Sequence, residues 1–523
     1  MSDTVAARWV ARAWALLVAS SALYFLADNE ADNDLWMHLF SGRLILGARA
    51  VPRVDHLSYT AAGLPWVDHE WLSQVAFAIA FDLSGSAGLW LGKLAVALLT
   101  TWLVWLPVAR RARSPWVRGA VMVLVLATLA RGYAIRPQVV TYLGVAALLA
   151  WLDRLEDAPR LPATWMAALL TAAGFVLWAN AHGGFVVGLG IVALFAVAPR
   201  WPHSRSAAPP RASAPGTQKE QDLPAASLPF GGRMTMLLAA LVGACITPYG
   251  PALFGYLVTE LQAPHPLTEW QPVHLSDPAH LPVLLLLTAL LATLPFARTL
   301  RRRPWWAVLT ALVAVMALRH QRHTPLLALV IAAPLAEQLD AARSWMRART
   351  SFRLSPSSQG LVATALAALA LIQVGLLSAR VWRTGGQVVY AADEYPVGAL
   401  AYLHEHDVHG NLALPLDWGG YALWHVAPAV KVSLDGRFAT VYPPRVVADN
   451  FAFFRGDGGA DAARLLDTYD STLVLVPHGV PTALDGRAGW QVLYADSTAT
   501  LFGKSGDRAA HASEAPRGWL LFP

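Results

Sequence analysis

Residues 8–38 read RWVARAWALLVASSALYFLADNEADNDLWMH, and this stretch decides the fold class. Its apolar segment at 8–26 is close to the ~20 residues that a membrane-spanning helix needs. Acidic residues from Asp28 to Asp34 follow directly, without the small-residue cleavage site that ends a signal peptide. The stretch therefore predicts a retained membrane helix that leads into an acidic loop.

The rest of the chain repeats this apolar character. Its 523 residues are 56% apolar and only 14% charged, whereas soluble domains carry about 25% charged residues. Soluble, disordered and fibrous proteins are therefore excluded, and the single Cys245 rules out a disulfide-stapled scaffold. Further apolar stretches predict a polytopic α-helical membrane protein with about eleven spans. They lie at 86–108, 117–133, 137–153, 161–180, 183–198, 234–250, 280–297, 305–319, 323–338 and 358–380.

The net charge of +6 is distributed unevenly. Arginine gathers in alternate loops between the apolar stretches, whereas the long loop 251–279 contains neither Lys nor Arg. Because cytoplasmic loops are enriched in Lys and Arg, we predict a bacterial inner-membrane protein with a cytoplasmic N-terminus and a periplasmic C-terminus. Positive charge placed between apolar blocks reports orientation in the bilayer, so we expect no nucleic-acid partner.

Two domains are predicted from a change in composition near residue 380. Residues 1–380 form a transmembrane domain, with an acidic first outer loop at 27–85 and a flexible cytoplasmic linker at 199–232. The outer loop contains interfacial helices, and 69–83 is apolar but short enough to be one of them. Residues 381–523 alternate β-prone runs with helix-like segments, which predicts a periplasmic α/β domain. The clearest β-prone runs are 412–416, 430–434, 472–476 and 491–494.

Two acidic clusters lie in the first outer loop. In residues 32–38, DNDLWMH, two carboxylates and an imidazole can bind a divalent cation or act as a general base. A solvated loop that caps a helix end explains the same residues equally well. In residues 68–71, DHEW, Asp68 can cap a helix. Ser73 stands where a zinc-protease helix needs its second histidine, so that chemistry is excluded.

Cationic and polar side chains recur at the predicted outer ends of several spans, against the charge rule. Binding of an anionic lipid phosphate would account for them, and snorkelling of single arginines is the alternative. The loop 251–279 adds the isolated acids Glu260 and Glu269. Gly-containing motifs at 416–421 and 435–437 suit either recognition loops or ordinary turns. The cationic and polar residues are Arg131, Arg136, Asn180, His182, Arg319, His320, Arg322 and His323.

Together these features resemble the GT-C superfamily of membrane glycosyltransferases, and a bacterial branch of it. That superfamily uses polyprenyl-phosphate-linked sugars and includes protein O-mannosyltransferases, aminoarabinose transferases and oligosaccharyltransferases. The resemblance covers nearly the whole chain and implies that Asp34 or Asp32 is the catalytic carboxylate. The stretch LDWGGY at 416–421 is similar to the acceptor-recognition motif of oligosaccharyltransferases, although its tandem tryptophan is absent. The residues that this similarity implies for acceptor binding are Asp417, Trp418 and Tyr421.

We therefore predict a membrane glycosyltransferase that moves a sugar from a polyprenyl-phosphate or polyprenyl-diphosphate donor to an acceptor on the periplasmic side. Asp34 or Asp32 would deprotonate the acceptor, and His69 and Glu70 would complete the site. A divalent cation, Mg²⁺ or Mn²⁺, is an open question, with Asp34, His38 and Glu70 as candidate ligands. The alternatives are a transporter or lipid flippase, and a non-catalytic subunit of a cell-envelope polysaccharide assembly. The residues expected to bind the donor phosphate are Arg136, His182, Arg319 and Arg322.

Overall fold

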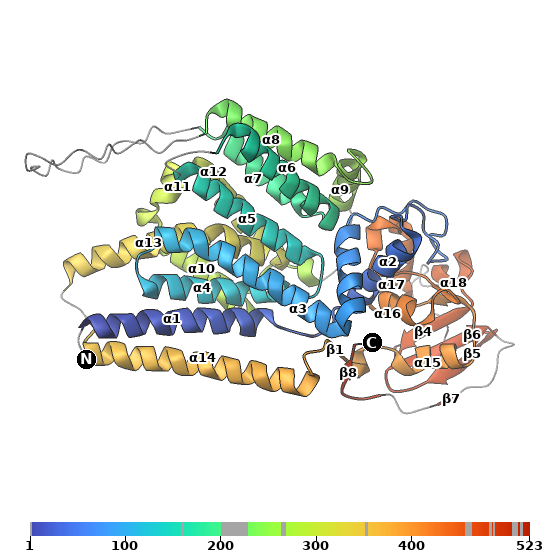
Figure 1. The fold of residues 1–523 in the computed structure, drawn as a ribbon. Coiled ribbons are helices and arrows are strands. Elements are labelled where there is room, and N and C mark those ends of the chain that lie inside the picture. Colours follow the sequence, from blue (N-terminus) through green and yellow to red (C-terminus); the bar gives the residue numbers. More distant parts are fainter. Residues whose placement is uncertain are drawn as a thin grey trace, which may run out of the picture.

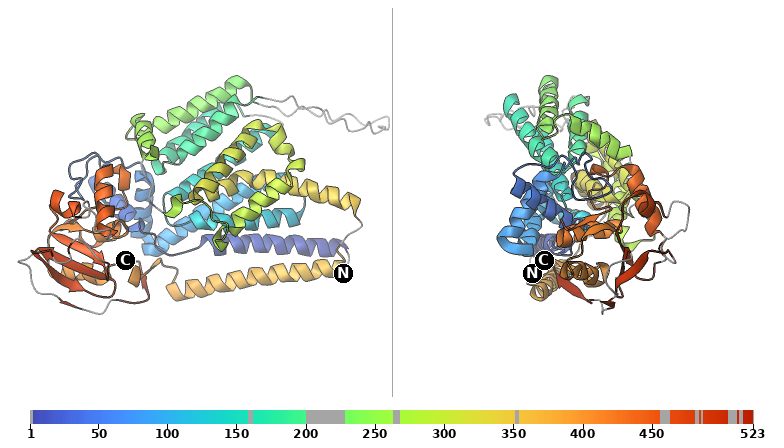
Figure 2. Two further views of the ribbon diagram at one scale, coloured as in Figure 1. Left: turned by 180° about the vertical axis from the view of Figure 1, so that it is seen from behind. Right: turned by 90° about the vertical axis from the view of Figure 1, so that its right-hand side faces the viewer.

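A bundle of helices carries a sheet-containing domain at one end (Figure 1). The N-terminus lies at the other end of the bundle, and the C-terminus lies beside the sheet domain (Figure 2). Most of the predicted linker 199–232 lies outside the described residues. The computed structural model describes residues 3–157, 162–199, 228–262, 268–350, 354–455, 463–480, 484, 487–504, 511–512 and 516–522.

Every apolar stretch marked in the sequence lies mainly in a helix, because a backbone in hydrocarbon must satisfy its hydrogen bonds within the segment. In the described part of the chain, seven helices are long and apolar enough to cross a membrane. The predicted fold class, a polytopic helical membrane protein with a C-terminal α/β region, is confirmed. The apolar helices are α1 (Asp3–Leu26), α3 (Trp71–Arg111), α4 (Pro115–Leu129), α5 (Gln138–Asp157), α6 (Thr164–Ala181), α7 (Phe185–Val197), α8 (Phe230–Cys245), α10 (Leu281–Ala292), α12 (Pro304–Arg319), α13 (Thr324–Arg349) and α14 (Pro356–Thr384).

The segment between α1 and the long part of α3 stays at one end of the bundle. α2 (Leu35–Ala48) begins directly after the acidic cluster. The backbone of α3 leaves the helical conformation at Ser84 and Gly85. In Figure 1 the part of α3 before this break lies across the bundle end, and the part after it runs along the bundle. The acidic loop is therefore enclosed by helices that do not follow the bundle axis.

The bundle is built around α13, in which Thr324 to Ala336 are all buried. α1 and α14 run side by side along one face (Figures 1 and 2). Ser20 Oγ of α1 donates a hydrogen bond to Gln373 Oε1 of α14 at 2.7 Å. Such bonds pair polar groups for which hydrocarbon offers no partner. Two shorter helices are α9 (Ala252–Gln262) and α11 (Arg298–Arg302).

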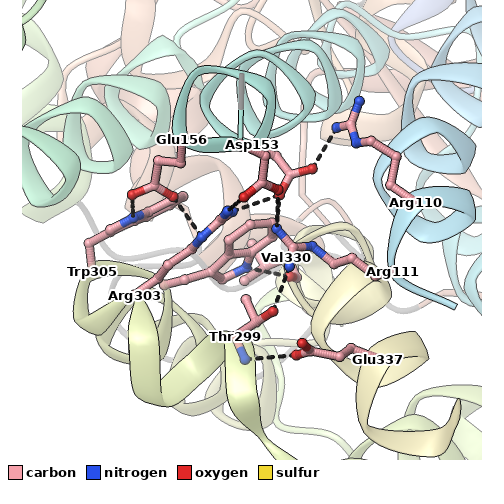
Figure 3. A network of polar contacts seen from close by, with 11 residues as sticks. Arg110, Arg111, Asp153, Glu156, Thr299, Arg303, Trp305, Val330 and Glu337 are labelled. Carbon is pink, nitrogen blue, oxygen red and sulfur yellow. Dashed lines mark hydrogen bonds and ion pairs between the residues drawn. The ribbon is translucent and has the colours of Figure 1, made fainter. Parts of the chain in front are cut away.

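An ionic network, here called the inner network, joins several helix ends (Figure 3), at the end of the bundle far from the sheet domain (Figure 1). Asp153, near the end of α5, is completely buried. It accepts hydrogen bonds from three guanidiniums, those of Arg110, Arg111 and Arg303. Arg303 Nε also lies 2.9 Å from Glu156 Oε2. The network joins the ends of α3 and α5 to the start of α12.

The C-terminal region forms a six-stranded mixed sheet, with strand order β3-β2-β4-β6-β5-β7 among the described residues. β2 pairs in parallel with β3 and β4, and β6 pairs antiparallel with β4 and β5. A separate two-stranded sheet joins β1 (Val389–Ala391) to β8 (Trp519–Leu521). Each predicted β-prone run overlaps a strand. The elements are β2 (Gly410–Ala413), β3 (Val430–Val432), β4 (Leu473–Pro477), β5 (Trp490–Ala495), β6 (Ala499–Lys504), β7 (His511–Ala512), α15 (Val397–Glu405), α16 (Leu416–Val426), α17 (Pro444–Phe454) and α18 (Arg464–Thr468).

The motif at 416–421 is neither a loop nor a turn, since it forms the first part of α16. Glycine is costly inside a helix, but here it permits close packing. A Cβ at Gly419 would lie 2.2 Å from the carbonyl oxygen of Leu434. This contact joins residues that are distant along the chain, so the motif alone could not reveal it.

The sheet domain is joined to the first outer loop. In strand β3, the N–H of Val432 donates to the Leu57 carbonyl at 3.4 Å, and its carbonyl accepts from the Tyr59 N–H at 3.2 Å. The loop thereby continues the edge of the sheet. Trp36 of α2 is fully buried where the two parts meet. The aromatic rings around Trp36 belong to Tyr390, Tyr395, Tyr421 and Phe522.

Candidate functional site

Three carboxylates converge on the guanidinium of Arg136 at the bundle end beside the sheet domain. Arg136 Nε contacts Asp32 Oδ1, and Arg136 Nη2 lies 3.0 Å from Asp34 Oδ2. Arg136 Nη1 lies 3.6 Å from Glu269 Oε2, and Arg322 Nη1 lies 3.0 Å from Glu269 Oε1. These side chains, here called the outer cluster, are between one fifth and one third exposed. Solvent and a substrate can therefore reach them.

Local structure fixes the members that come from the first loop and from the turn before α5. Asp34 stands at the start of α2, and its backbone N–H donates to Asp32 Oδ1 at 3.1 Å. Arg136 precedes Pro137, whose ring restricts the backbone of the residue before it. The Arg136 N–H also donates to the Ala134 carbonyl at 2.9 Å. The guanidinium is thus presented from a constrained turn.

Glu269 is a member of the outer cluster that the sequence did not identify. It lies in a short 3-10 helix, Thr268–Trp270, within the loop between α9 and α10. The Arg322 guanidinium stacks over the neighbouring Trp270, with its carbon 4.4 Å from the ring centre. The pair Glu269-Trp270 was the only local signal, because an acid beside an aromatic ring can hold an arginine by charge and by cation–π contact.

The environment of Asp34 favours its protonated form. Burial raises the pKa of Asp34 to about 7; Arg136 opposes this shift, and the charges of Asp32 and Glu269 add to it. A carboxyl group whose pKa lies near neutral pH can take up a proton and release it again. Asp34 therefore has the properties of a general base.

Glu70 and two histidines form a second group close to the first. Glu70 Oε1 lies 3.5 Å from His182 Nε2 and 3.9 Å from His69 Nε2. On the other side of its ring, His182 Nδ1 accepts a hydrogen bond from the Gly184 N–H at 2.9 Å, and Thr141 Oγ1 lies 2.7 Å away. A neutral imidazole whose Nδ1 accepts carries its proton on Nε2. His182 therefore directs an N–H toward Glu70.

This second group is largely uncharged at neutral pH. Burial raises the pKa of Glu70 to about 8, and the charges of Asp68 and Asp34 add to the shift. Burial lowers the pKa of His69 to about 4 and that of His182 well below its ordinary value. A protonated carboxyl and two neutral imidazoles can donate and accept hydrogen bonds without adding net charge beside Asp34.

The C-terminal domain supplies one wall of the site. Gly436 lies so close to Asp34 that a Cβ there would be 2.2 Å from Asp34 Oδ1. The neighbouring Arg437 is buried, with Nη1 2.5 Å from Asp55 Oδ1 and Nη2 2.7 Å from Asp435 Oδ2. The pair with Asp55 ties the wall to the first outer loop, so the site exists only where the two domains meet.

Two cavities are relevant to the site, and the first adjoins the outer cluster through Glu269 and Arg322. One has a volume of about 160 Å³ and is lined by Arg131, Gln138, Gln321 and Arg322, together with Glu269 and apolar neighbours. Guanidinium and amide donors of this kind suit a phosphate group. The other is an apolar groove of about 400 Å³ between α5 and α6. Its lining includes Val140, Ala147, Trp151, Leu170, Phe175 and Trp178.

The structure places the expected phosphate and acceptor ligands in different surroundings. Arg319 is exposed at the end of α12, and no ion pair within the described residues joins it to the outer cluster. Arg131 lines the cavity instead. Trp418 and Tyr421 are only 7% and 2% exposed, and both pack in the domain core. Of the three expected acceptor ligands, Asp417 alone is exposed.

The expected metal ligands Asp34, His38 and Glu70 do not form a metal site. Among the residues that the structure describes, no three His, Cys, Asp or Glu side chains are placed to hold a metal ion. The guanidinium of Arg136 lies where the carboxylates converge. With Arg136 among these carboxylates, the residues present do not fit a metal, and we derive no chemical step through one.

Comparison with solved structures identifies the fold. The oligosaccharyltransferase of Archaeoglobus fulgidus in its apo form matches with a TM-score of 0.56 and 12% identity, covering 89% of this chain and 69% of that chain. The chain has the GT-C fold. AglB from Archaeoglobus fulgidus in complex with an inhibitory peptide and a dolichol-phosphate matches this chain with a TM-score of 0.52 and 12% identity, over the same shares. ArnT from Cupriavidus metallidurans in the apo state matches with a TM-score of 0.50 and 14% identity, covering 95% of this chain and 98% of that chain.

The resemblance to the GT-C superfamily is thereby confirmed at the level of fold. No family model matches the sequence, and no curated protein sequence matches it. Because one fold can carry many activities, the function of this chain has to be argued from its own side chains.

Proposed function

We propose that this chain transfers a sugar from a polyprenyl-phosphate or polyprenyl-diphosphate donor to an acceptor, at the periplasmic face of a bacterial inner membrane. The observation that carries the proposal is Asp34, a carboxyl group with a pKa of about 7 beside a cavity that offers Arg131 and Arg322 to a phosphate. A base and a phosphate site close together are the two parts that transfer from a lipid phosphate requires.

In the proposed reaction, the oxygen of an acceptor hydroxyl attacks the anomeric carbon of the donor sugar, and Asp34 takes the hydroxyl proton. The bond between the anomeric carbon and the phosphate oxygen breaks. Its electron pair stays on the phosphate, where the guanidiniums of Arg131 and Arg322 stabilise the added charge. Glu70 and His182 would donate hydrogen bonds to the sugar or to the acceptor.

Two features of the bundle support a lipid-linked donor and a periplasmic site. The groove between α5 and α6 is lined almost entirely by apolar side chains, which suits an isoprenoid tail. Arg110, Arg111 and Arg303 lie at the bundle end opposite the outer cluster, where the positive-inside rule predicts the cytoplasm.

The test is transfer of a labelled sugar by the full-length protein in detergent, from a panel of short-chain polyprenyl-phosphate and polyprenyl-diphosphate sugars. Wild type is compared with Asp34→Asn and Asp32→Asn. Asp82→Asn is the matched control. Asp82 forms an ion pair with Arg43, and both side chains are about half exposed, more than those of the outer cluster. We expect turnover to fall about 10²–10⁴-fold in Asp34→Asn while donor binding is kept. The Asp32→Asn result decides whether Asp32 shares that role.

A wild-type protein that binds these donors and never turns one over would contradict the proposal. A transporter would then move the lipid between leaflets of a reconstituted vesicle. A non-catalytic subunit would do neither, and would tolerate both substitutions.

A further inference from the structure

The guanidinium of Arg136 distributes its N–H donors among three carboxylates. Each of its three nitrogens faces a different carboxylate: Nε faces Asp32, Nη2 faces Asp34 and Nη1 faces Glu269. The carboxylates come from two separate parts of the chain, the first outer loop and the loop before α10. One planar cation therefore contacts all three carboxylates, and Arg322 adds a second ion pair to Glu269.

Carboxylates that converge from separate segments are also the oxygen ligands by which proteins bind Mg²⁺ and Mn²⁺. Such a cluster needs a cation, because several carboxylates close together repel one another. In this chain the cation is covalently attached. Arg136 follows a tight backbone turn and precedes Pro137, so its guanidinium reaches the cluster from a fixed point.

We infer that the guanidinium of Arg136 occupies the position that a divalent cation would otherwise take among Asp32, Asp34 and Glu269, and that Arg136 is the positioning residue for Asp34. The inference about which cation the three carboxylates bind can be tested without any enzymatic activity. The consequence that sugar transfer needs no bound metal rests on the proposed function.

Lysine cannot reproduce this arrangement. The guanidinium is planar and presents donors along separate edges, whereas an ammonium is a compact point charge. Arg136→Lys keeps the charge but offers one nitrogen to three carboxylates. We expect this variant to lose transfer by at least about tenfold, because Asp34 is held less accurately.

The decisive experiment measures Mn²⁺ binding to the full-length protein in detergent by electron paramagnetic resonance. Wild type is compared with Arg136→Ala and with Arg136→Gln, a second variant that keeps a polar side chain in case the first one fails to fold. Arg43→Ala is the matched control, because its removal frees the single carboxylate of Asp82.

We expect no tightly bound Mn²⁺ in wild type or Arg43→Ala, and about one Mn²⁺ per chain in a folded Arg136 variant. Adding Asp34→Asn to that variant should weaken the new site at least about tenfold. A wild-type Mn²⁺ site that Asp34→Asn removes would overturn the inference. A folded Arg136→Gln protein that gains no site would overturn it as well.

The transfer assay separates this inference from the proposed function. Wild-type transfer should change less than about twofold on treatment with EDTA. If transfer is absent altogether, the proposed function fails, and the Mn²⁺ result still decides the role of Arg136. If transfer occurs and EDTA abolishes it, the proposed function survives and the metal-free reaction is wrong.

Discussion

Two carboxylate–guanidinium networks lie at opposite ends of one helix bundle, and they differ in how completely they are closed. In the inner network, Asp153 is 0% exposed and three arginines surround it. In the outer cluster, Asp34 is 30% exposed, and two guanidiniums, those of Arg136 and Arg322, serve three carboxylates. The inner network is sealed and rich in positive charge around its buried carboxylate. The outer cluster is open and rich in negative charge.

The difference separates a structural role from a chemical one. A sealed carboxylate with several cationic partners stays ionised and fixes the helices that carry those partners. The pKa of Asp34 is raised to about 7, first by burial and then by its acidic neighbours, so this partly exposed carboxyl can exchange protons with a substrate. Both networks use the same residue types, so composition does not distinguish them. The burial of the carboxylates and the ratio of guanidiniums to carboxylates distinguish the two networks.

The largest expected effect falls on stability at the inner network. Asp153→Asn should lower the free energy of unfolding by about 3–5 kcal/mol, because buried guanidiniums lose their charged partner. Thermal melting in detergent measures this loss. The control is Asp157→Asn, whose side chain is 51% exposed and whose loss should cost at most about 1 kcal/mol. Equal melting of the two variants would show that burial of the carboxylate does not set its contribution, because Asp157 pairs with the same Arg111 and Arg303.

A smaller effect is expected at the wall of the outer cluster. Gly436→Ala places a methyl group against Asp34 Oδ1, so it should reduce transfer by at least about tenfold, or about 1.4 kcal/mol. Its melting temperature should change little in comparison. Gly375→Ala is the matched control, because a Cβ at that position of α14 meets no atom within 4 Å. Unchanged transfer in Gly436→Ala would show that the sheet domain does not confine Asp34.

Donor affinity tests the cavity beside the outer cluster. Arg131→Ala should raise the KM for the donor about tenfold, because a hydrogen bond to a charged group is worth about 1.5–3 kcal/mol and solvent access weakens it here. The maximal rate should change less than KM. Arg319→Ala serves as the control, since Arg319 lies outside the cavity lining. If Arg319→Ala raised KM more than Arg131→Ala, the donor phosphate would bind at Arg319, as the sequence predicts.

The smallest expected effect is a shift in pH dependence. If ionised Asp34 is the active form, the rate should rise with pH through about 7. Glu269→Gln removes a charge that raises the pKa of Asp34, so the rising limb should move to lower pH by up to about one unit. A profile that stays in place in Glu269→Gln would show that Glu269 does not act on the base.

The same pKa predicts a trend in stability. The folded-state pKa of Asp34 lies above its ordinary value of 3.8, so ionisation of Asp34 costs stability as pH rises from about 4 through 7. The Asp34→Asn protein should therefore lose less stability than wild type over this range.

Several parts of the site follow from sequence because their signals are local. Asp32 and Asp34 stand directly after an apolar run, and Arg136 stands against the charge rule at the end of another. Glu269 was missed because its partners Arg136 and Arg322 come from other loops. The motif at 416–421 suggests a loop or turn in the sequence, whereas it forms the first part of α16, where Gly419 packs closely against Leu434.

By itself, the sequence determined the membrane class, the apolar helices and the acidic loop that follows the first of them, because each depends on the composition of a continuous segment. It did not determine which arginine neutralises which acid. Arg319 and Arg131 look alike in sequence, yet only Arg131 lines the cavity beside Glu269. The tertiary structure decided these pairings, along with the wall that Gly436 forms against Asp34. Ion pairing and steric contact depend on distances between segments that are remote along the chain, and folding alone sets those distances.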